Sequence, residues 1–322
     1  MLDRASDLRK SPDWLAQQWS DPDCQVLLLQ NDKNLMHWDR DQAPVAIYPL
    51  RQDIKALINE TNTVVFLGLN GTVPLFAAEI EISIEAYFEA QPYLKHNDHQ
   101  FIDVRALGCL LNAQDAAMLA YARGLLFWNR NSLFCGRCGM PTIQKQGGHA
   151  KHCSNESCGH LTFPRTDPAV IMLIEDYSNP DQPRCLLGRN AKFPNRMMST
   201  LAGFVDPSES LEETVVRESF EEAGIRVGEV TYQASQPWPF PSSIMLGFRA
   251  LATTTDIRID GVEIEEAGWF TVEQLKSFGE WGDDDENYCL PRSDSIARYL
   301  IESWISDVIK SNEASKTTPL LL

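Results

Sequence analysis

The fold is decided by the stretch Gly203-Phe-Val-Asp-Pro-Ser-Glu209, which is followed after seven residues by Arg217-Glu-Ser-Phe-Glu-Glu-Ala-Gly-Ile225. Between the two blocks, Ser210 has a glutamate three residues further on, which is the pattern of a capping box at a helix N-terminus. The glycine just before Ile225 is the residue type that most often ends a helix, because it adopts positive φ at little steric cost. The pattern therefore predicts a helix over Leu211–Ala223.

Three glutamates share one face of this predicted helix. Glu218, Glu221 and Glu222 stand at positions i, i+3 and i+4, where like charges repel by roughly a few tenths of a kcal/mol per pair. A solvated helix face would explain such a charge run. A hard divalent cation would turn the repulsion into binding, because Mg²⁺ and Mn²⁺ take oxygen ligands and bridge to phosphates, and the turn-forming loop before the helix favours this interpretation. The opposite face carries the row expected to pack on a sheet, Leu211, Val215 and Ser219.

Four cysteines form a second cluster. Cys135-Gly-Arg-Cys138 and Cys153-Ser-Asn-Glu-Ser-Cys158 are two close pairs separated by 14 residues. Each pair can offer two thiolates from a tight turn, and four thiolates complete the closed tetrahedron of a structural zinc site. A redox pair would not need the second pair, although one of the nearby histidines (His149, His152 and His160) could replace a ligand. The other four cysteines are scattered, as expected of buried thiols.

Composition excludes several classes of protein. The 322 residues carry a formal net charge of −17, so a general nucleic-acid coat or a binder of anionic membranes is excluded, since both need a basic face. The 43% apolar and 9% aromatic content is that of an ordinary folded protein. No stretch approaches the roughly 18 apolar residues that span a bilayer, and the acidic start lacks the apolar core of a signal peptide. We therefore expect a cytoplasmic protein.

The cysteine region is locally basic. Between residues 130 and 165, five cations stand against a single acid, Glu156. The cations are Arg130, Arg137, Lys145, Lys151 and Arg165. This segment could meet the phosphates of a substrate, and a solvated surface is the alternative explanation.

Strands interleaved with a few helices indicate an α/β class. A β-hairpin with a type I′ turn at Asn70-Gly71 is predicted from the strands Thr63–Leu69 and Val73–Ala77. The other predicted strands are Cys24–Leu29, Val45–Tyr48, Ala169–Ile174, Gly247–Ala252 and Glu265–Phe270. The other predicted helices are Ala113–Trp128 and Ser293–Ile309.

The block from Gly203 to Ile225 resembles the signature of the Nudix hydrolases. In that signature a glycine, five residues, a glutamate and seven residues precede Arg-Glu-x-x-Glu-Glu-x-Gly and an aliphatic residue. The positions in register are Gly203, Glu209, Arg217, Glu218, Glu221, Glu222, Gly224 and Ile225. Ser219 stands where the family has an aliphatic residue, a packing position. The resemblance implies that Glu209 pairs with Arg217 to brace the loop, and that the helix glutamates bind the metal ions.

A second stretch, Ser235-Gln-Pro-Trp-Pro-Phe-Pro-Ser-Ser243, reduces the range of possible substrates. Its three prolines restrict the backbone and would hold Trp238 and Phe240 as a stacking platform for a base or nicotinamide ring, with a core-packing turn as the alternative. The stretch is similar to the array that marks the NADH pyrophosphatase branch of the Nudix family. The segments 122–136, 163–168 and 295–298 also resemble that branch, whereas the first hundred residues fit it only loosely.

The branch resemblance implies site residues. Glu222, Glu218 and Glu221 would be catalytic, with Glu222 as the residue that orients or deprotonates the attacking water. The Mg²⁺ or Mn²⁺ ligands would be Glu218, Glu221, Glu222, Glu263 and the main-chain carbonyl of Ala202, with Glu265 and Glu266 as alternatives to Glu263. The zinc ligands would be Cys135, Cys138, Cys153 and Cys158. The substrate-binding residues would be Arg105, Phe163, Phe204, Gln236, Pro237, Trp238, Pro239, Phe240, Pro241, Ser242, Ser243 and Ala297. Phe163 replaces a tyrosine of some members, so it can stack but cannot donate a hydrogen bond.

The expected architecture is a Nudix α/β/α sandwich with a mixed sheet, preceded by a zinc ribbon and a strand-rich α+β N-terminal domain. We expect an N-terminal domain over 1–130, the ribbon over 131–164, the Nudix domain over 165–309 and a flexible tail over 310–322. The resemblance also implies a homodimer.

The expected activity is metal-dependent hydrolysis of the pyrophosphate of NADH and NAD to nicotinamide mononucleotide and AMP, with NAD-capped RNA 5′ ends as a further substrate. The enzymatic alternative is an ADP-ribose or dinucleoside polyphosphate hydrolase, which needs the carboxylate helix but not the Trp238–Phe240 array. The non-enzymatic alternative is a dinucleotide-sensing regulator, in which one or more of the signature glutamates would be replaced.

Overall fold

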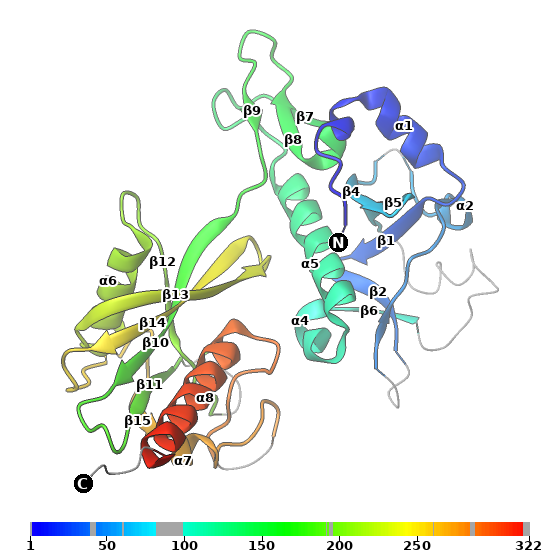
Figure 1. The fold of residues 1–322 in the computed structure, drawn as a ribbon. Coiled ribbons are helices and arrows are strands. Elements are labelled where there is room, and N and C mark those ends of the chain that lie inside the picture. The colour runs from blue at the N-terminus through cyan, green and yellow to red at the C-terminus, as the bar shows by residue number, and fades with distance from the viewer. Residues whose placement is uncertain are drawn as a thin grey trace. The chain divides into compact units, whose positions relative to one another are not determined.

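The chain divides into two units, each built around its own β-sheet (Figure 1). The structure is a computed structural model that describes residues 2–38, 43–59, 61–81, 99–190, 192, 196–259, 261–283 and 287–317. The first unit comprises Met1–Thr166 with Pro239–Ser242, and the second comprises Asp167–Trp238 with Ser243–Leu322. Among the described residues, no helix combines the length and apolar character needed to cross a bilayer.

The first unit contains a sheet in the order β3-β2-β1-β5-β4, with β6 paired to β2. Its strands are β1 (Gln25–Gln30), β2 (Lys33–His37), β3 (Val45–Ala46), β4 (Val64–Asn70), β5 (Val73–Glu79) and β6 (His99–Ile102). Its helices are α1 (Pro12–Ser20), α2 (Arg51–Ile54), α4 (Val104–Leu107) and α5 (Ala113–Asn131), with 3-10 turns at Leu8–Lys10 and Gly108–Leu110.

Alternation along β4 and β5 gives this sheet two apolar faces. Val65 and Leu67 pack with Leu119 and other buried residues of α5. Phe66, between them in sequence, points to the opposite face and packs with Phe76 and with aromatic residues of α1. Because successive side chains of a strand point to opposite sides, this one hairpin supplies both cores.

The hairpin turn lies one residue later than predicted. Asn70 pairs with Val73, so the two central residues are Gly71 and Thr72. Only Gly71, at φ 64°, has positive φ. A type I′ turn needs positive φ at both central positions, whereas type II′ needs it only at the first. The predicted type I′ turn is therefore wrong, because Thr72 keeps the negative φ that a β-branched residue prefers.

The cysteine region forms a small antiparallel sheet in the order β7-β8-β9 within the first unit. The strands are β7 (Thr142–Lys145), β8 (Ala150–Cys153) and β9 (Leu161–Thr162), with a 3-10 turn at Gln146–Gly148.

The second unit has a mixed sheet in the order β13-β14-β10-β11-β15, with β12 also paired to β10. Its strands are β10 (Asp167–Asp176), β11 (Arg184–Arg189), β12 (Leu201–Phe204), β13 (Val227–Trp238), β14 (Ser243–Ala252) and β15 (Glu266–Thr271). The central strand β10 runs parallel to β14 and antiparallel to β11 and β12. Its helices are α6 (Leu211–Ala223), α7 (Val272–Leu275) and α8 (Ile296–Thr317).

Helices cover both faces of the second sheet. Val215 and Ala223 of α6 pack with residues of β10 and β14 on one face. Leu300 and Trp304 of α8 pack with α7 and with the other set of β10 residues on the opposite face. The predicted α/β/α sandwich with a mixed sheet is confirmed.

Several elements differ in extent from their predictions. Helix α8 ends at Thr317 instead of Ile309, so the residues up to 317 of the expected tail are helical, and residues 318–322 lie outside the described part of the chain. Strand β14 begins at Ser243, earlier than the predicted Gly247. Helix α6 has the predicted bounds.

Replacing Trp304 by alanine should lower the free energy of unfolding of the second unit by about 3–5 kcal/mol, because the indole is fully buried and truncation leaves a cavity. Its Nε1 also donates to the Tyr177 hydroxyl at 3.2 Å. Urea unfolding of the full chain measures the change. Tyr299→Ala is the matched control, since this residue of the same helix is 49% exposed, and its effect should stay near about 0.5 kcal/mol. Equal losses in both variants would contradict the assigned core.

Candidate active site

The loop that enters α6 is fixed at the helix start by the capping box. The Ser210 side chain accepts a hydrogen bond from the Glu213 amide at 3.2 Å, and the Glu213 carboxylate accepts one from the Ser210 amide at 2.8 Å. Gly224 ends the helix in the left-handed conformation at φ 69°. Ser219, at the family's aliphatic position, is fully buried and satisfies its hydroxyl by donating to the Val215 carbonyl at 2.6 Å.

A bidentate ion pair joins the loop to the helix. Arg217 donates from Nε to Glu209 Oε1 at 2.7 Å and from Nη2 to Glu209 Oε2 at 2.9 Å. The same Nη2 donates to the carbonyl of Phe204 at 2.9 Å, at the end of β12. Thr214 Oγ1 and the Asp206 amide also donate to the Glu209 carboxylate. Strand, loop and helix therefore meet at one guanidinium.

These donors lower the pKa of Glu209 to about 2, with the hydrogen bond from Arg217 as the largest cause. The same contacts raise the pKa of Arg217 above its usual range. Both groups are therefore charged throughout the physiological range.

The carboxylates of α6 differ in environment. Glu222 is buried, Glu218 is nearly buried, and Glu221 reaches the surface. Arg217 Nη1 donates to Glu218 Oε1 at 2.8 Å and to Glu221 Oε2 at 2.9 Å. One guanidinium thus contacts two of the three helix glutamates that are expected to bind metal.

Glu218 lies against the backbone of β12 at Gly203. A Cβ built on Gly203 would come within 1.9 Å of the Glu218 carboxyl group. Any other residue at this position would displace that carboxylate, so glycine is required for the close approach. Ala202, whose carbonyl is an expected metal ligand, is the neighbouring residue on the same strand.

Burial raises the pKa of Glu218, and the nearby carboxylates of Glu221 and Glu263 raise it further, whereas Arg217 opposes both effects. A partly buried carboxylate beside two others favours a cation, so the donor set fits a hard divalent ion. Among the described residues, however, the helix carboxylates do not converge as closely as the cysteine thiols do. An ion would compete with Arg217 for Glu218 and Glu221.

The three acids near residue 265 are in different situations. Glu265 is ion-paired with Arg189, and Glu266 accepts a hydrogen bond from the Tyr288 hydroxyl. Glu263 is exposed and lies within electrostatic range of Glu218.

The four cysteines of the small sheet converge. The Sγ atoms of Cys135, Cys138, Cys153 and Cys158 all lie within 4.8 Å of one another. The distance from Cys135 to Cys158 is 3.9 Å and that from Cys138 to Cys153 is 3.4 Å. A tetrahedron with Zn–S bonds of about 2.3 Å has edges of about 3.8 Å, so the thiols fit zinc. The Arg137 amide donates to Cys135 Sγ, the largest cause that lowers the pKa of this thiol to about 7.

The basic character of the ribbon is smaller than its sequence suggests. Arg130 is ion-paired with Asp32 and Glu79. Lys151 is buried and donates to the Asn129 carbonyl at 2.8 Å. These two cations stabilise the first unit. The other three expected cations, Arg137, Lys145 and Arg165, are exposed.

The proline-rich array spans the end of β13 and the start of β14. Pro237 pairs with Ile244 and Trp238 pairs with Ser243, so residues 239–242 form the connection. The Phe240-Pro241 peptide bond is cis. Gln236 Nε2 donates to the Asp294 carbonyl at 2.8 Å, and Gln236 Oε1 accepts from the Ile296 amide at 2.9 Å. The Gln236 amide therefore binds the turn before α8, and Ala297 in that helix is buried in the core of the second unit.

The connection 239–242 belongs to the first unit, where the Phe240 ring is flanked by two guanidinium groups. The Cζ atoms of Arg123 and Arg105 lie 4.7 and 5.7 Å from the ring centroid. Asp103 binds both arginines, at 2.8 and 2.6 Å. Two of the other three expected aromatic residues have open rings, since Phe163 in the first unit is 57% exposed and Phe204 in the second is 60% exposed. The third, Trp238, is half-buried.

Comparison with known proteins agrees with this geometry. Residues 165–290 match the NUDIX domain profile, residues 130–163 match the NADH pyrophosphatase zinc ribbon domain, and residues 16–128 match the NADH pyrophosphatase-like rudimentary NUDIX domain. NAD-capped RNA hydrolase NUDT12 from Homo sapiens is 35% identical over 95% of this chain and 72% of its own length.

The chain belongs to the Nudix hydrolase family. NAD-capped RNA hydrolase NudC from Mycobacterium bovis is 41% identical over 63% of this chain and 64% of its own length. Nudix hydrolase 19, chloroplastic, from Arabidopsis thaliana is 48% identical over 50% of this chain and 37% of its own length. The predicted resemblance to the NADH pyrophosphatase branch is confirmed, as is the zinc ribbon.

Sequence reasoning missed one residue that contacts the proline-rich array. Arg123 contacts the Phe240 ring more closely than the expected Arg105 does, and it is buried. Its partners, Asp103 and Phe240, are distant in the sequence, so local spacing gave no signal for Arg123.

Glu209→Gln should destabilise the chain at neutral pH, because it removes the carboxylate that Arg217 binds. The pKa of Glu209 is lowered from 4.5 to about 2, so its stabilisation is complete above about pH 4.5 and is lost as the pH falls toward 2. Urea unfolding midpoints of wild type and variant should therefore differ at pH 7 and converge as the pH approaches 2. The exposed Glu212→Gln on the same helix should show little effect at any pH. A difference that does not change with pH would contradict the pairing.

Proposed function

We propose that this chain hydrolyses the pyrophosphate bond of NADH and NAD to nicotinamide mononucleotide and AMP, and that it removes NAD caps from RNA 5′ ends. The observation that carries the proposal is the braced carboxylate set of α6, in a chain that is 35% identical to an enzyme named NAD-capped RNA hydrolase. The four-cysteine ribbon and the proline-rich array support the same branch.

Glu218, Glu221, Glu222 and Glu263, with the main-chain carbonyl of Ala202, would hold Mg²⁺ or Mn²⁺. Such ions, when bound, neutralise the diphosphate and polarise its phosphorus. Cations are needed because a chain of net charge −17 would otherwise repel a dinucleotide. The electrostatic interaction of Glu263 with Glu218 supports Glu263 as the distant ligand.

Glu222 is our candidate for the general base. Its side chain is buried, and it stands on α6 beside the other two helix glutamates. In the proposed reaction it accepts a proton from water as the water oxygen bonds to phosphorus and the bond from that phosphorus to the bridging oxygen breaks. The two products are the two mononucleotides.

The substrate residues have different proposed roles. Phe204 and Phe163 each offer an open ring face for a base or the nicotinamide, and Trp238 and the residues that follow it would contact the dinucleotide. Gln236 acts through the turn that it binds, which supports a positioning role, and Ala297 is limited to contact through its backbone because its side chain is buried. Arg105 acts beside Phe240.

We also propose that the protein is a homodimer of the cytoplasm, where thiols stay reduced and a thiolate metal site persists. All eight cysteines are free in the structure, in agreement with such a compartment.

Glu222→Gln should lower kcat for NADH by about 10²–10⁴-fold, the usual contribution of a general base, without unfolding the chain. Chromatography of the products from purified protein with Mg²⁺ or Mn²⁺ measures turnover. Glu212→Gln on the same helix is the matched control and should retain wild-type turnover. Unchanged turnover in Glu222→Gln would assign the base to Glu263 or another residue.

A parallel incubation with NAD-capped RNA tests the second substrate. The expected products are an RNA with a 5′ monophosphate and free nicotinamide mononucleotide. An intact cap in the presence of active enzyme would exclude the RNA activity and leave the dinucleotide activity standing.

Cys138→Ser should release the structural metal, because a closed four-sulfur site loses most of its affinity when one thiolate is removed. Metal content measured by mass spectrometry should fall from one zinc per chain to well below one. The scattered Cys109→Ser variant should keep its zinc. Full zinc retention in Cys138→Ser would contradict the four-cysteine site.

A further inference from the structure

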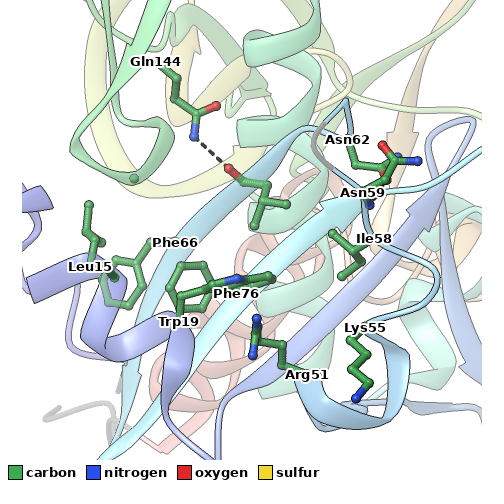
Figure 2. A pocket seen from close by; sticks show the side chains of 13 residues that line it. Leu15, Trp19, Arg51, Lys55, Ile58, Asn59, Asn62, Phe66, Phe76 and Gln144 are labelled. Atoms are coloured by element: carbon green, nitrogen blue, oxygen red, sulfur yellow. Dashed lines mark hydrogen bonds between the residues drawn. The ribbon is translucent and has the colours of Figure 1, made fainter. Parts of the chain in front are cut away.

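A cavity of about 530 Å³ lies in the first unit, and all the residues that line it belong to that unit (Figure 2). It lies on the sheet face that carries Phe66 and Phe76, between residues of α1 and the segment that begins at α2. Its volume is in the range of sites that enclose small organic ligands. Neither the carboxylate set nor the proline-rich array contributes to its lining.

Aromatic rings form the apolar part of the cavity. The rings of Phe66 and Phe76 pack edge to face at 5.1 Å, and Trp19 packs against Phe76 at 4.9 Å. The two phenylalanines are anchored on adjacent strands β4 and β5 and are almost fully buried. This wall is therefore rigid and suited to a planar ring.

Two cations line the same cavity. The Cζ atom of Arg51 lies 4.8 Å from the centre of the Trp19 ring, and Lys55 lies one helical turn further along the chain. Arg51 Nε is buried without a hydrogen-bond partner, and neither cation forms an ion pair with a described residue. No described lining residue is acidic, although the chain as a whole has a net charge of −17. Two cations without an acidic partner among the described residues favour an anionic ligand.

Amide side chains supply the remaining polar lining. Gln144 Nε2 donates to the Val64 carbonyl at 2.7 Å, and Asn62 Nδ2 donates to the Glu79 carbonyl at 3.0 Å. These bonds orient the two amides, while Asn59 lies beside Asn62 (Figure 2). Oriented amides next to aromatic rings are suited to the polar edge of a base.

We propose that this cavity binds a nucleoside monophosphate, with the phosphate on Arg51 and Lys55 and the base against the accessible part of the Trp19 ring, which packs against Phe76. The planar guanidinium suits phosphate oxygens, and the ammonium adds a second charge for a dianion. The described residues around the cavity include no carboxylate set of the kind found on α6, so the ligand is bound and not hydrolysed there.

AMP is the probe for this site, measured by isothermal titration calorimetry with the full chain and no added Mg²⁺ or Mn²⁺. The Arg51→Gln/Lys55→Gln variant should bind AMP at least tenfold more weakly at one site than wild type does. Lys10→Gln is the matched control, because Lys10 is an exposed cation of the same unit that pairs only with the exposed Asp7 among the described residues, and it should bind as wild type does. Adenosine and inorganic phosphate should each bind more weakly than AMP.

Equal AMP affinity in wild type and the double variant would overturn the proposal, because all binding would then occur elsewhere in the chain. Adenosine that binds as well as AMP would also overturn it, since the cations would have no role. Crystals of the full wild-type chain with AMP give a measurement that does not depend on the variant's folding. Phosphate density within hydrogen-bond distance of Arg51 is expected, and a cavity without AMP density would refute the proposal.

Discussion

The ion pair between Arg217 and Glu209 is the interaction on which the rest of the candidate active site depends. It joins the end of β12, the loop and the second turn of α6 through a single guanidinium, which also donates to the Phe204 carbonyl. A bidentate pair of this kind restricts geometry as well as contributing energy. The ion pair therefore fixes the position of α6 and of its carboxylates Glu218, Glu221 and Glu222.

The same arginine explains how three acids coexist on one helix face. Arg217 neutralises part of the charge of Glu218 and Glu221 through its other terminal nitrogen. This contact opposes the burial and the acidic neighbours that raise the pKa of Glu218. In the proposed enzyme, a divalent ion that binds Glu218 and Glu221 must displace their hydrogen bonds to Arg217. The apparent affinity for the metal is therefore reduced by the free energy of those two hydrogen bonds.

Local patterns in the sequence were sufficient for some features and not for others. The bounds of α6 and the clustering of the cysteines follow from caps and short spacings, which are local. The contact of Glu218 with Gly203 and the burial of Lys151 depend on partners distant in the sequence, so spacing alone could not reveal them. The turn after Asn70 was misplaced because its register is set by the pairing of the two strands.

The two-sided hairpin of the first unit has a consequence for how its sequence can change. Residues 65–67 of β4 send neighbouring side chains into two different cores. A slip of one position between β4 and β5 would exchange valine and phenylalanine between those cores, overfilling the space beside α5 and leaving the α1 side loosely packed. Insertions or deletions in the Gly71-Thr72 connection are therefore tolerated only if each side chain of β4 and β5 still points to the same face of the sheet.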